Sequence, residues 1–172
     1  MIQPSIAQAQ PLTHTLEALR HSRSRPELAE ALMDWLRPRG GQCYVLARLP
    51  DGPYKMPDIL LSGGDDSEAW LSRYRREHLY IGDPLLAAMR PAMAPPMNWS
   101  NLTQSRKAPL SAATQRALDA MQAHQKTEGV SLPVWGPSGL GGFLSVGGPL
   151  ANADPETLAS ASLLAAHALP LA

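Results

Sequence analysis

The chain has 172 residues, the size of one domain with at most a small appendage. Hydrophobic residues make up 44% of it and charged residues 17%, which excludes a disordered protein and indicates a globular one. Fifteen basic and fifteen acidic side chains cancel, so the net charge gives no support to a nucleic-acid-binding surface.

The cysteine content and the absence of long apolar segments indicate in which cellular compartment the protein is expected. A single cysteine, Cys43, rules out an internal disulfide and fits a reducing environment. The N-terminus has no basic start followed by an apolar run, and no apolar stretch approaches the roughly 18 residues that a membrane helix needs. We therefore expect a cytoplasmic protein without a signal peptide or a membrane-spanning segment.

Helical spacing of apolar residues dominates the N-terminal part of the chain. We expect residues 1–11 to form a loose terminus, and leucines at helical spacing predict a helix over about 12–21. Pro26 opens a second predicted helix that Pro38 ends. Trp35 lies on the apolar face of this helix, and we interpret it as a core residue rather than a ligand-binding one.

Two strands are predicted next. Residues 42–49 predict a strand. Because every second side chain of a strand points to the same face, Val45 and Ala47 lie on one face. Residues 50–57 predict a turn, and residues 58–62 a short second strand.

The following segment holds most of the polar and aromatic residues of interest. Trp70 and Tyr74 are four residues apart, so a helix places them on one face, and Ser67 could cap that helix. Asp83 before Pro84 predicts the start of another helix, because Asp caps free N–H groups and Pro is tolerated at the first helical position. The indole, which only donates, and the carboxylate, which only accepts, could converge on one cavity.

The remaining predicted elements are an extended, proline-rich loop over 91–99, a helix over 111–126, strands over 130–134 and 140–146 joined by a hairpin at 136–139, and a last helix that begins at Asp154-Pro155. The resulting order is ααββααββα. It predicts an α/β fold, an α/β/α sandwich with a central antiparallel sheet and helices on both faces.

Two blocks of residues resemble a known family. The first consists of Trp70, Tyr74, Asp83-Pro84 and Trp99. The second, GVSLPVWGPSGLGGFLSVGG, has the matching residues Gly129, Ser131, Pro133, Gly136, Gly139 and Ser145. Their order and spacing are similar to those of the autoinducer-binding domain of LuxR-type quorum-sensing regulators, over about residues 12–170. The resemblance implies a PAS/GAF-like sandwich, usually of five strands, of which the sequence predicts four.

The resemblance also implies a ligand, an acyl-homoserine lactone, and a partner for each of its polar groups. The indole N–H of Trp70 would donate to the ring carbonyl, the carboxylate of Asp83 would accept from the amide N–H, and the hydroxyl of Ser145 would donate to the amide carbonyl. The implied walls around the ring and the acyl tail are Tyr74, Trp99, Val45, Ala47, Leu60, Leu86 and Met89.

One position departs from the family pattern. Members commonly have a Tyr four residues before the Trp, and its hydroxyl also reaches the amide carbonyl, whereas this chain has Asp66. A carboxylate cannot replace that donor unless it is protonated. The departure leaves open a weaker affinity or a different ligand.

Signals for other chemistry are weak. The five histidines lie apart without metal-ligand spacing, the segment GPSGLGG lacks the ending of a phosphate-binding loop, and no Ser or Cys sits in a recognisable nucleophile motif. We expect no enzyme, no metal site and no cofactor.

LuxR-type regulators normally continue into a helix-turn-helix domain, and we expect none in this chain, which runs to Ala172. We favour an isolated sensor domain that forms a homodimer and meets DNA only through a helix-turn-helix domain absent from the chain. One alternative is a truncated LuxR-like interaction protein that heterodimerises with full-length regulators and inhibits them. Others are a LuxR-type sensor of a non-lactone ligand and a PAS or GAF sensor of an unrelated one.

Overall fold

A five-stranded antiparallel sheet forms the centre of the computed structural model, which describes residues 10–91, 94–104, 110–136 and 139–172. The sheet has the order β2-β1-β5-β4-β3. Its strands are β1 (Cys43–Arg48), β2 (Asp58–Gly64), β3 (Met97–Asn98), β4 (Gly129–Gly136) and β5 (Gly139–Gly147). The predicted fold class is confirmed. The predicted loose N-terminus lies almost wholly outside the described residues.

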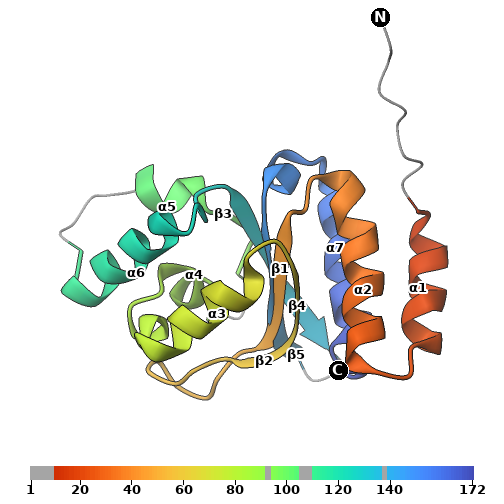
Figure 1. Cartoon of the computed structure of the whole chain (residues 1–172), viewed down its shortest axis with the longest axis horizontal. Helices are drawn as coiled ribbons and strands as arrows, with labels where there is room; N and C mark the ends of the chain where they lie inside the picture. Colours follow the sequence, from red (N-terminus) through yellow and green to blue (C-terminus); the bar gives the residue numbers. More distant parts are fainter. Residues whose placement is uncertain (1–9, 92–93, 105–109, 137–138) are drawn as a thin grey trace, which may run out of the picture.

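Two long helices cover one face of the sheet, and a third packs against their outer side (Figure 1). The two are α2 (Arg25–Leu36) and α7 (Pro155–Ala168), and the third is α1 (Leu12–His21), with short 3-10 turns at Arg37–Arg39 and Pro149–Asn152. Leucines of these helices and of the sheet form the main hydrophobic core. Trp35 is 2% exposed within this core, which confirms its interpretation as a core residue.

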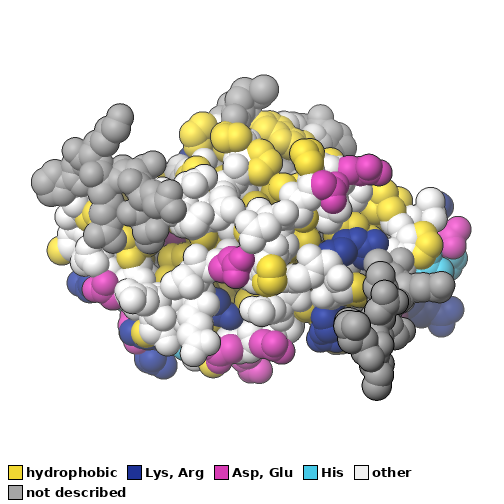
Figure 2. Space-filling view, turned by 90° about the horizontal axis from the view of Figure 1, so that it is seen from above, with side chains coloured by type: hydrophobic (Ala, Val, Ile, Leu, Met, Phe, Trp, Pro, Cys, Tyr) yellow, Lys and Arg dark blue, Asp and Glu magenta, His cyan; other side chains and the backbone are white. Residues whose placement is uncertain are grey.

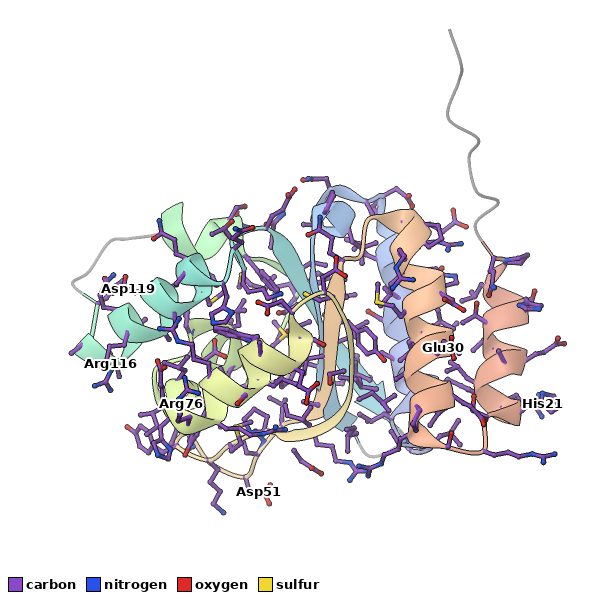
Figure 3. The ribbon with its side chains drawn as sticks, in the orientation of Figure 1. His21, Glu30, Asp51, Arg76, Arg116 and Asp119 are labelled. Carbon is purple, nitrogen blue, oxygen red and sulfur yellow. The ribbon has the colours of Figure 1, made fainter. Side chains whose placement is uncertain are left out.

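The helices of the middle of the chain cover the opposite face (Figure 1). They are α3 (Ser67–Arg76), α4 (Pro84–Ala88), α5 (Ser100–Gln104) and α6 (Ala112–Ala123), with a 3-10 turn at Leu79–Ile81. Figure 3 shows side chains filling the space between this layer and the sheet, with the labelled Arg76, Arg116 and Asp119 on its outer side. The sequence did not predict α5.

The starts of the helices follow local side-chain chemistry. Asp83 accepts hydrogen bonds from the backbone N–H groups that open α4, and Asp154 does the same for α7. Ser67 is not the cap that the sequence suggested. It is the first residue of α3 and donates its hydroxyl to the carbonyl of Gly64, while Asp66 occupies the cap position in a left-handed conformation with φ 57°.

A β-bulge between β1 and β2 decides which side chains of β2 face the layer of α3 and α4. Leu46 lies opposite Leu61 and Ala47 lies opposite Ile59, so Leu60 is the extra residue. Leu60 and Leu61 therefore both belong to the main core under α1, α2 and α7. Leu60, expected in the wall of the site, therefore lies on the opposite face of the sheet, and Ile59 packs on the side of Ala47 and Leu86.

The surface mixes side chains of different kinds. Figure 2 shows one face on which acidic, basic and apolar side chains are interspersed. Among the described residues, no helix has the length and apolar character needed to cross a bilayer.

Candidate ligand-binding site

A cavity of about 70 Å³ lies between the sheet and the layer of α3, α4 and α6. Apolar and aromatic side chains make up most of its wall. Six residues expected at the site line it: Trp70, Asp83, Ser145, Tyr74, Trp99 and Val45. Ala47, Leu86 and Met89 do not line it but belong to an adjacent apolar cluster.

The carboxylate of Asp83 is held by three hydrogen bonds. Tyr74, on α3, donates its hydroxyl to Oδ2 at 2.6 Å. The backbone N–H groups of Leu85 and Leu86 donate to Oδ1 at 2.8 and 3.4 Å. Because an ionised carboxylate offers about four acceptor sites, one site, on Oδ2, receives no donor from the described residues.

Burial sets the electrostatics of this pair. It raises the pKa of Asp83 above its ordinary value, and the hydrogen bonds from Tyr74 and the two amides only partly oppose that effect. Burial, with the neighbouring charge of Asp83, also raises the pKa of Tyr74. A further N–H donor at Asp83 would stabilise the charged carboxylate.

Trp70 is half-buried and lies between two aromatic rings. Its ring centroid is 5.6 Å from that of Tyr74 and 5.4 Å from that of His124. Its indole N–H makes no hydrogen bond with any described residue, and Trp70 lines the cavity. The site thus offers one unused N–H donor near one incompletely used carboxylate.

Trp99 begins a chain of polar groups across the sheet. Its indole N–H donates to Oγ of Ser131 at 3.0 Å, and Oγ of Ser131 lies 2.6 Å from Oγ of Ser145. Since Ser131 accepts from Trp99, it can direct its own proton to Ser145, which frees the hydroxyl of Ser145 to donate into the cavity. Ser131 is fully buried.

Two paired glycines make room for side chains of the cavity wall, Gly129 for the indole of Trp99 and Gly147 for the thiol of Cys43. Gly129 and Gly147 lie opposite each other in β4 and β5. A Cβ on Gly129 would lie 2.6 Å from the indole, and a Cβ on Gly147 would lie 2.8 Å from Sγ of Cys43. Side chains at these positions would therefore displace a wall of the cavity.

Asp66, the residue that departs from the family pattern, turns away from the cavity and does not line it. Its carboxylate pairs with Nδ1 of His124 at 2.9 Å. That hydrogen bond holds the pKa of Asp66 below its ordinary value. The carboxylate of Asp66 is therefore hydrogen-bonded at the contact between α3 and the end of α6 and does not line the cavity.

An apolar cluster continues the wall of the cavity. Its buried members are Ala47, Leu86, Met89, Ala94 and Phe143. Phe143 belongs to both the cluster and the cavity wall, as do the partly buried Val45 and Ile59. Ala47, Leu86 and Met89 thus lie directly beside the cavity, whereas Leu60, the fourth expected residue that does not line it, lies in the main core.

Sequence reasoning missed several residues of the wall. It assigned no role to the wall residues Lys126, Cys43 and Phe143. It also assigned none to Ser131, which was part of the second family block and, without lining the cavity, bonds to Trp99 and Ser145. The positive charge of Lys126 was one available signal, but nothing local indicates which way that side chain points.

A mostly apolar cavity with a few placed polar groups, enclosed between a sheet and a helical layer, is the form of a small-molecule-binding domain. The sequence matches the model of the family described as autoinducer binding domain over residues 24–170. The chain belongs to this family, the autoinducer-binding domains of LuxR-type regulators. Such a domain senses a small-molecule autoinducer and is not an enzyme.

Solved structures share the fold. An N-acylhomoserine lactone dependent LuxR family transcription factor, CepR2 from Burkholderia cenocepacia, superposes with a TM-score of 0.69 at 16% identity over 92% of this chain and 94% of that one. Escherichia coli SdiA gives 0.61 at 20% identity over 92% and 67%. SdiA in complex with octanoyl-rac-glycerol gives 0.60 at 20% identity over 90% and 64%. No curated protein sequence matches the chain.

Proposed function

We propose that the cavity binds an N-acyl-homoserine lactone and that the remaining acceptor site of Asp83 receives the amide N–H of this ligand. The observation that carries the proposal is the state of the Asp83 carboxylate. It is buried enough to raise its pKa, and three donors leave one of its acceptor sites unused. A buried carboxylate gains from each further hydrogen bond, and a bond to a charged group contributes about 1.5–3 kcal/mol.

Two further groups match the rest of the head group. The unused indole N–H of Trp70 donates to the ring carbonyl. The hydroxyl of Ser145, oriented by Ser131, donates to the amide carbonyl. Tyr74 then orients Asp83, and Trp99 acts as a wall because Ser131 already accepts its N–H.

The acyl tail extends toward the apolar cluster of Leu86, Met89 and Phe143. The cavity volume of about 70 Å³ is about half of the roughly 150 Å³ that holds benzene, so the cluster has to move when the tail enters. Burying an eight-carbon tail contributes roughly 6 kcal/mol at about 0.8 kcal/mol per methylene. The tail therefore supplies most of the affinity, and the polar groups supply the specificity for the head group.

A second candidate ligand is a neutral acyl compound without a lactone. SdiA has been solved with octanoyl-rac-glycerol, an acyl ester that lacks an amide N–H. In this chain a glycerol hydroxyl would take the place of the amide N–H at Asp83. We favour the lactone because the LuxR family neighbour CepR2 is described as N-acylhomoserine lactone dependent.

The domain's output follows from its family. We propose that ligand occupancy is passed to transcription by a LuxR-type regulator that acts as a homodimer, with DNA bound by its helix-turn-helix domain. Sedimentation of the chain with and without ligand tests the dimer, and a monomer under both conditions would contradict it.

Thermal unfolding against a panel of acyl-homoserine lactones tests the proposal. A ligand that binds only the native state raises the melting temperature with dose, and we expect this for the wild type. The shift should shrink strongly in Asp83→Asn and Trp70→Phe. The matched controls Asp119→Asn and Trp135→Phe alter an exposed residue of the same type outside the cavity. Equal shifts in all four variants would contradict the assignment.

A further inference from the structure

The cavity wall contains a cation that the proposed binding mode does not use. Of the residues that line the cavity, Asp83 and Lys126 carry charge. Lys126 lies beyond the end of α6, where Gln125 adopts a left-handed conformation with φ 55°. The backbone N–H of Lys126 closes the turn by donating to the carbonyl of Met121 at 2.8 Å. This turn directs the side chain of Lys126 back toward the sheet.

The partners of the ammonium group are weak. Nζ of Lys126 lies 3.1 Å from Sγ of Cys43 and 3.3 Å from the backbone carbonyl of Asp65. An ammonium has three donors, so one N–H remains. No carboxylate within the described ranges forms an ion pair with Lys126. Asp66, the acidic side chain on which its charge acts, is already paired with His124.

Lys126 also sits at a boundary between the cavity and the outside. Trp99, Met121 and Lys126 line both the cavity and a groove beside α5 and α6. The side chain of Lys126 therefore lines an apolar space on one side, where an uncompensated charge is unfavourable and an anionic partner is favourable. A ligand that enters the cavity can meet this charge without crossing the core.

We propose that Lys126 is a head-group-binding residue and that the cavity accepts N-acyl amino acids, ligands with a free carboxylate beside the acyl amide. Lys126 pairs with the carboxylate, and Asp83 accepts the amide N–H. This inference rests on the proposed function for the placement of the amide. It extends the ligand class from the neutral lactone to acids such as its ring-opened form, N-acyl-homoserine.

Calorimetric titration of the full chain with two matched compounds tests the inference. The compounds are N-octanoyl-L-homoserine lactone and N-octanoyl-L-homoserine, which carry the same acyl amide and differ in the carboxylate. We expect the acid to bind the wild type at least as tightly as the lactone. Charge-assisted hydrogen bonds are stronger than neutral ones. Lys126→Met should therefore lower the affinity for the acid by about tenfold or more and the affinity for the lactone by less than about threefold.

Two controls separate the charge from the fold. Lys126→Arg keeps the charge and should retain binding of the acid, and Lys55→Met removes an exposed lysine away from the cavity and should change neither affinity. In the wild type, raising the salt concentration should lower the affinity for the acid more than that for the lactone, because salt screens the attraction between Lys126 and the carboxylate. This comparison needs no variant.

The contrary outcomes are distinguishable. If the lactone binds and the acid binds more than about tenfold more weakly, or if Lys126→Met weakens both ligands equally, the role of Lys126 is wrong and the proposed function stands. If neither compound binds the wild type, the proposed function fails and this inference fails with it.

Discussion

Tyr74 donates its hydroxyl to Oδ2 of Asp83 at 2.6 Å and thereby joins α3 to the start of α4 inside the cavity. The same carboxylate caps α4 through the N–H groups of Leu85 and Leu86. One side chain of the cavity wall thus joins two helices and, among the described residues, keeps one acceptor site unused.

Tyr74→Phe removes the hydroxyl and keeps the ring. We expect it to lower the free energy of unfolding by about 1–3 kcal/mol, because Asp83 loses a hydrogen bond in a buried site. The pKa of Asp83 should rise further. As the pH is lowered, this variant should therefore lose lactone binding at a higher pH than the wild type does. Chemical denaturation and titrations at several pH values measure both effects. Tyr80→Phe is the control, since the hydroxyl of Tyr80 pairs with His78 outside the cavity. Identical behaviour of the two variants would contradict this role of Tyr74.

The raised pKa of Asp83 predicts two pH dependences. Between the unfolded value of about 3.9 and the raised native value, the native state binds more protons than the unfolded state. Stability of the ligand-free protein therefore falls as pH rises through this window and then levels off. Affinity for the lactone changes the opposite way and falls as pH drops below the native pKa, because a protonated carboxyl is a poorer acceptor.

Ligand binding should release protons in that window, since an amide N–H at Asp83 favours its charged form. Calorimetry in buffers of different ionisation enthalpy measures this release, and Asp83→Asn should abolish it. Proton release that persists in Asp83→Asn would assign the titration to another group.

Met89, 1% exposed in the apolar cluster beside the cavity, should influence the length of acyl chain that binds. We expect Met89→Ala to destabilise the protein by about 2–5 kcal/mol and to shift preference toward longer chains by opening space for the tail. Met33→Ala removes a similarly buried methionine on the opposite face of the sheet and should destabilise without changing the preference. If Met89→Ala and the wild type rank acyl chains of different length in the same order of affinity, the tail does not lie beside Met89.

Asp66→Asn tests whether the departure from the family pattern alters ligand binding. The carboxylate of Asp66 pairs with His124 and does not line the cavity. We therefore expect the affinity for the lactone to change by less than about threefold in calorimetric titration. A loss of tenfold or more would mean that Asp66 acts on the head group.

Local signals explain most of what the sequence predicted of the fold. The steps Asp83-Pro84 and Asp154-Pro155 carry their own helix starts, and the strand patterns from Cys43 and Gly129 onward predicted four strands. The strand β3 was missed because its two residues, in a proline-rich segment, are defined by pairing with β4 more than thirty residues later. The position of Leu60 was wrong for a similar reason, since a bulge in the ladder with β1 reverses its side.

The site was predictable only in part. The family blocks predicted Trp70, Asp83 and Ser145, which all line the cavity. Ser131 and Lys126 could not be assigned, because their partners Trp99 and Cys43 are distant in sequence. Such contacts depend on the pairing of β4 with β3 and β5 and on the turn after α6 that reaches β1, for which a single sequence offers no local pattern.

The most direct test of the account compares an N-acyl-homoserine lactone with an analogue whose amide nitrogen is replaced by an ester oxygen. Both are titrated into the wild type, Asp83→Asn and the control Asp119→Asn. If Asp83 accepts the amide N–H, the wild type and the control should prefer the amide by about tenfold or more, and Asp83→Asn should lose most of this preference. An equal preference in all three proteins, or none in the wild type, would contradict the central claim.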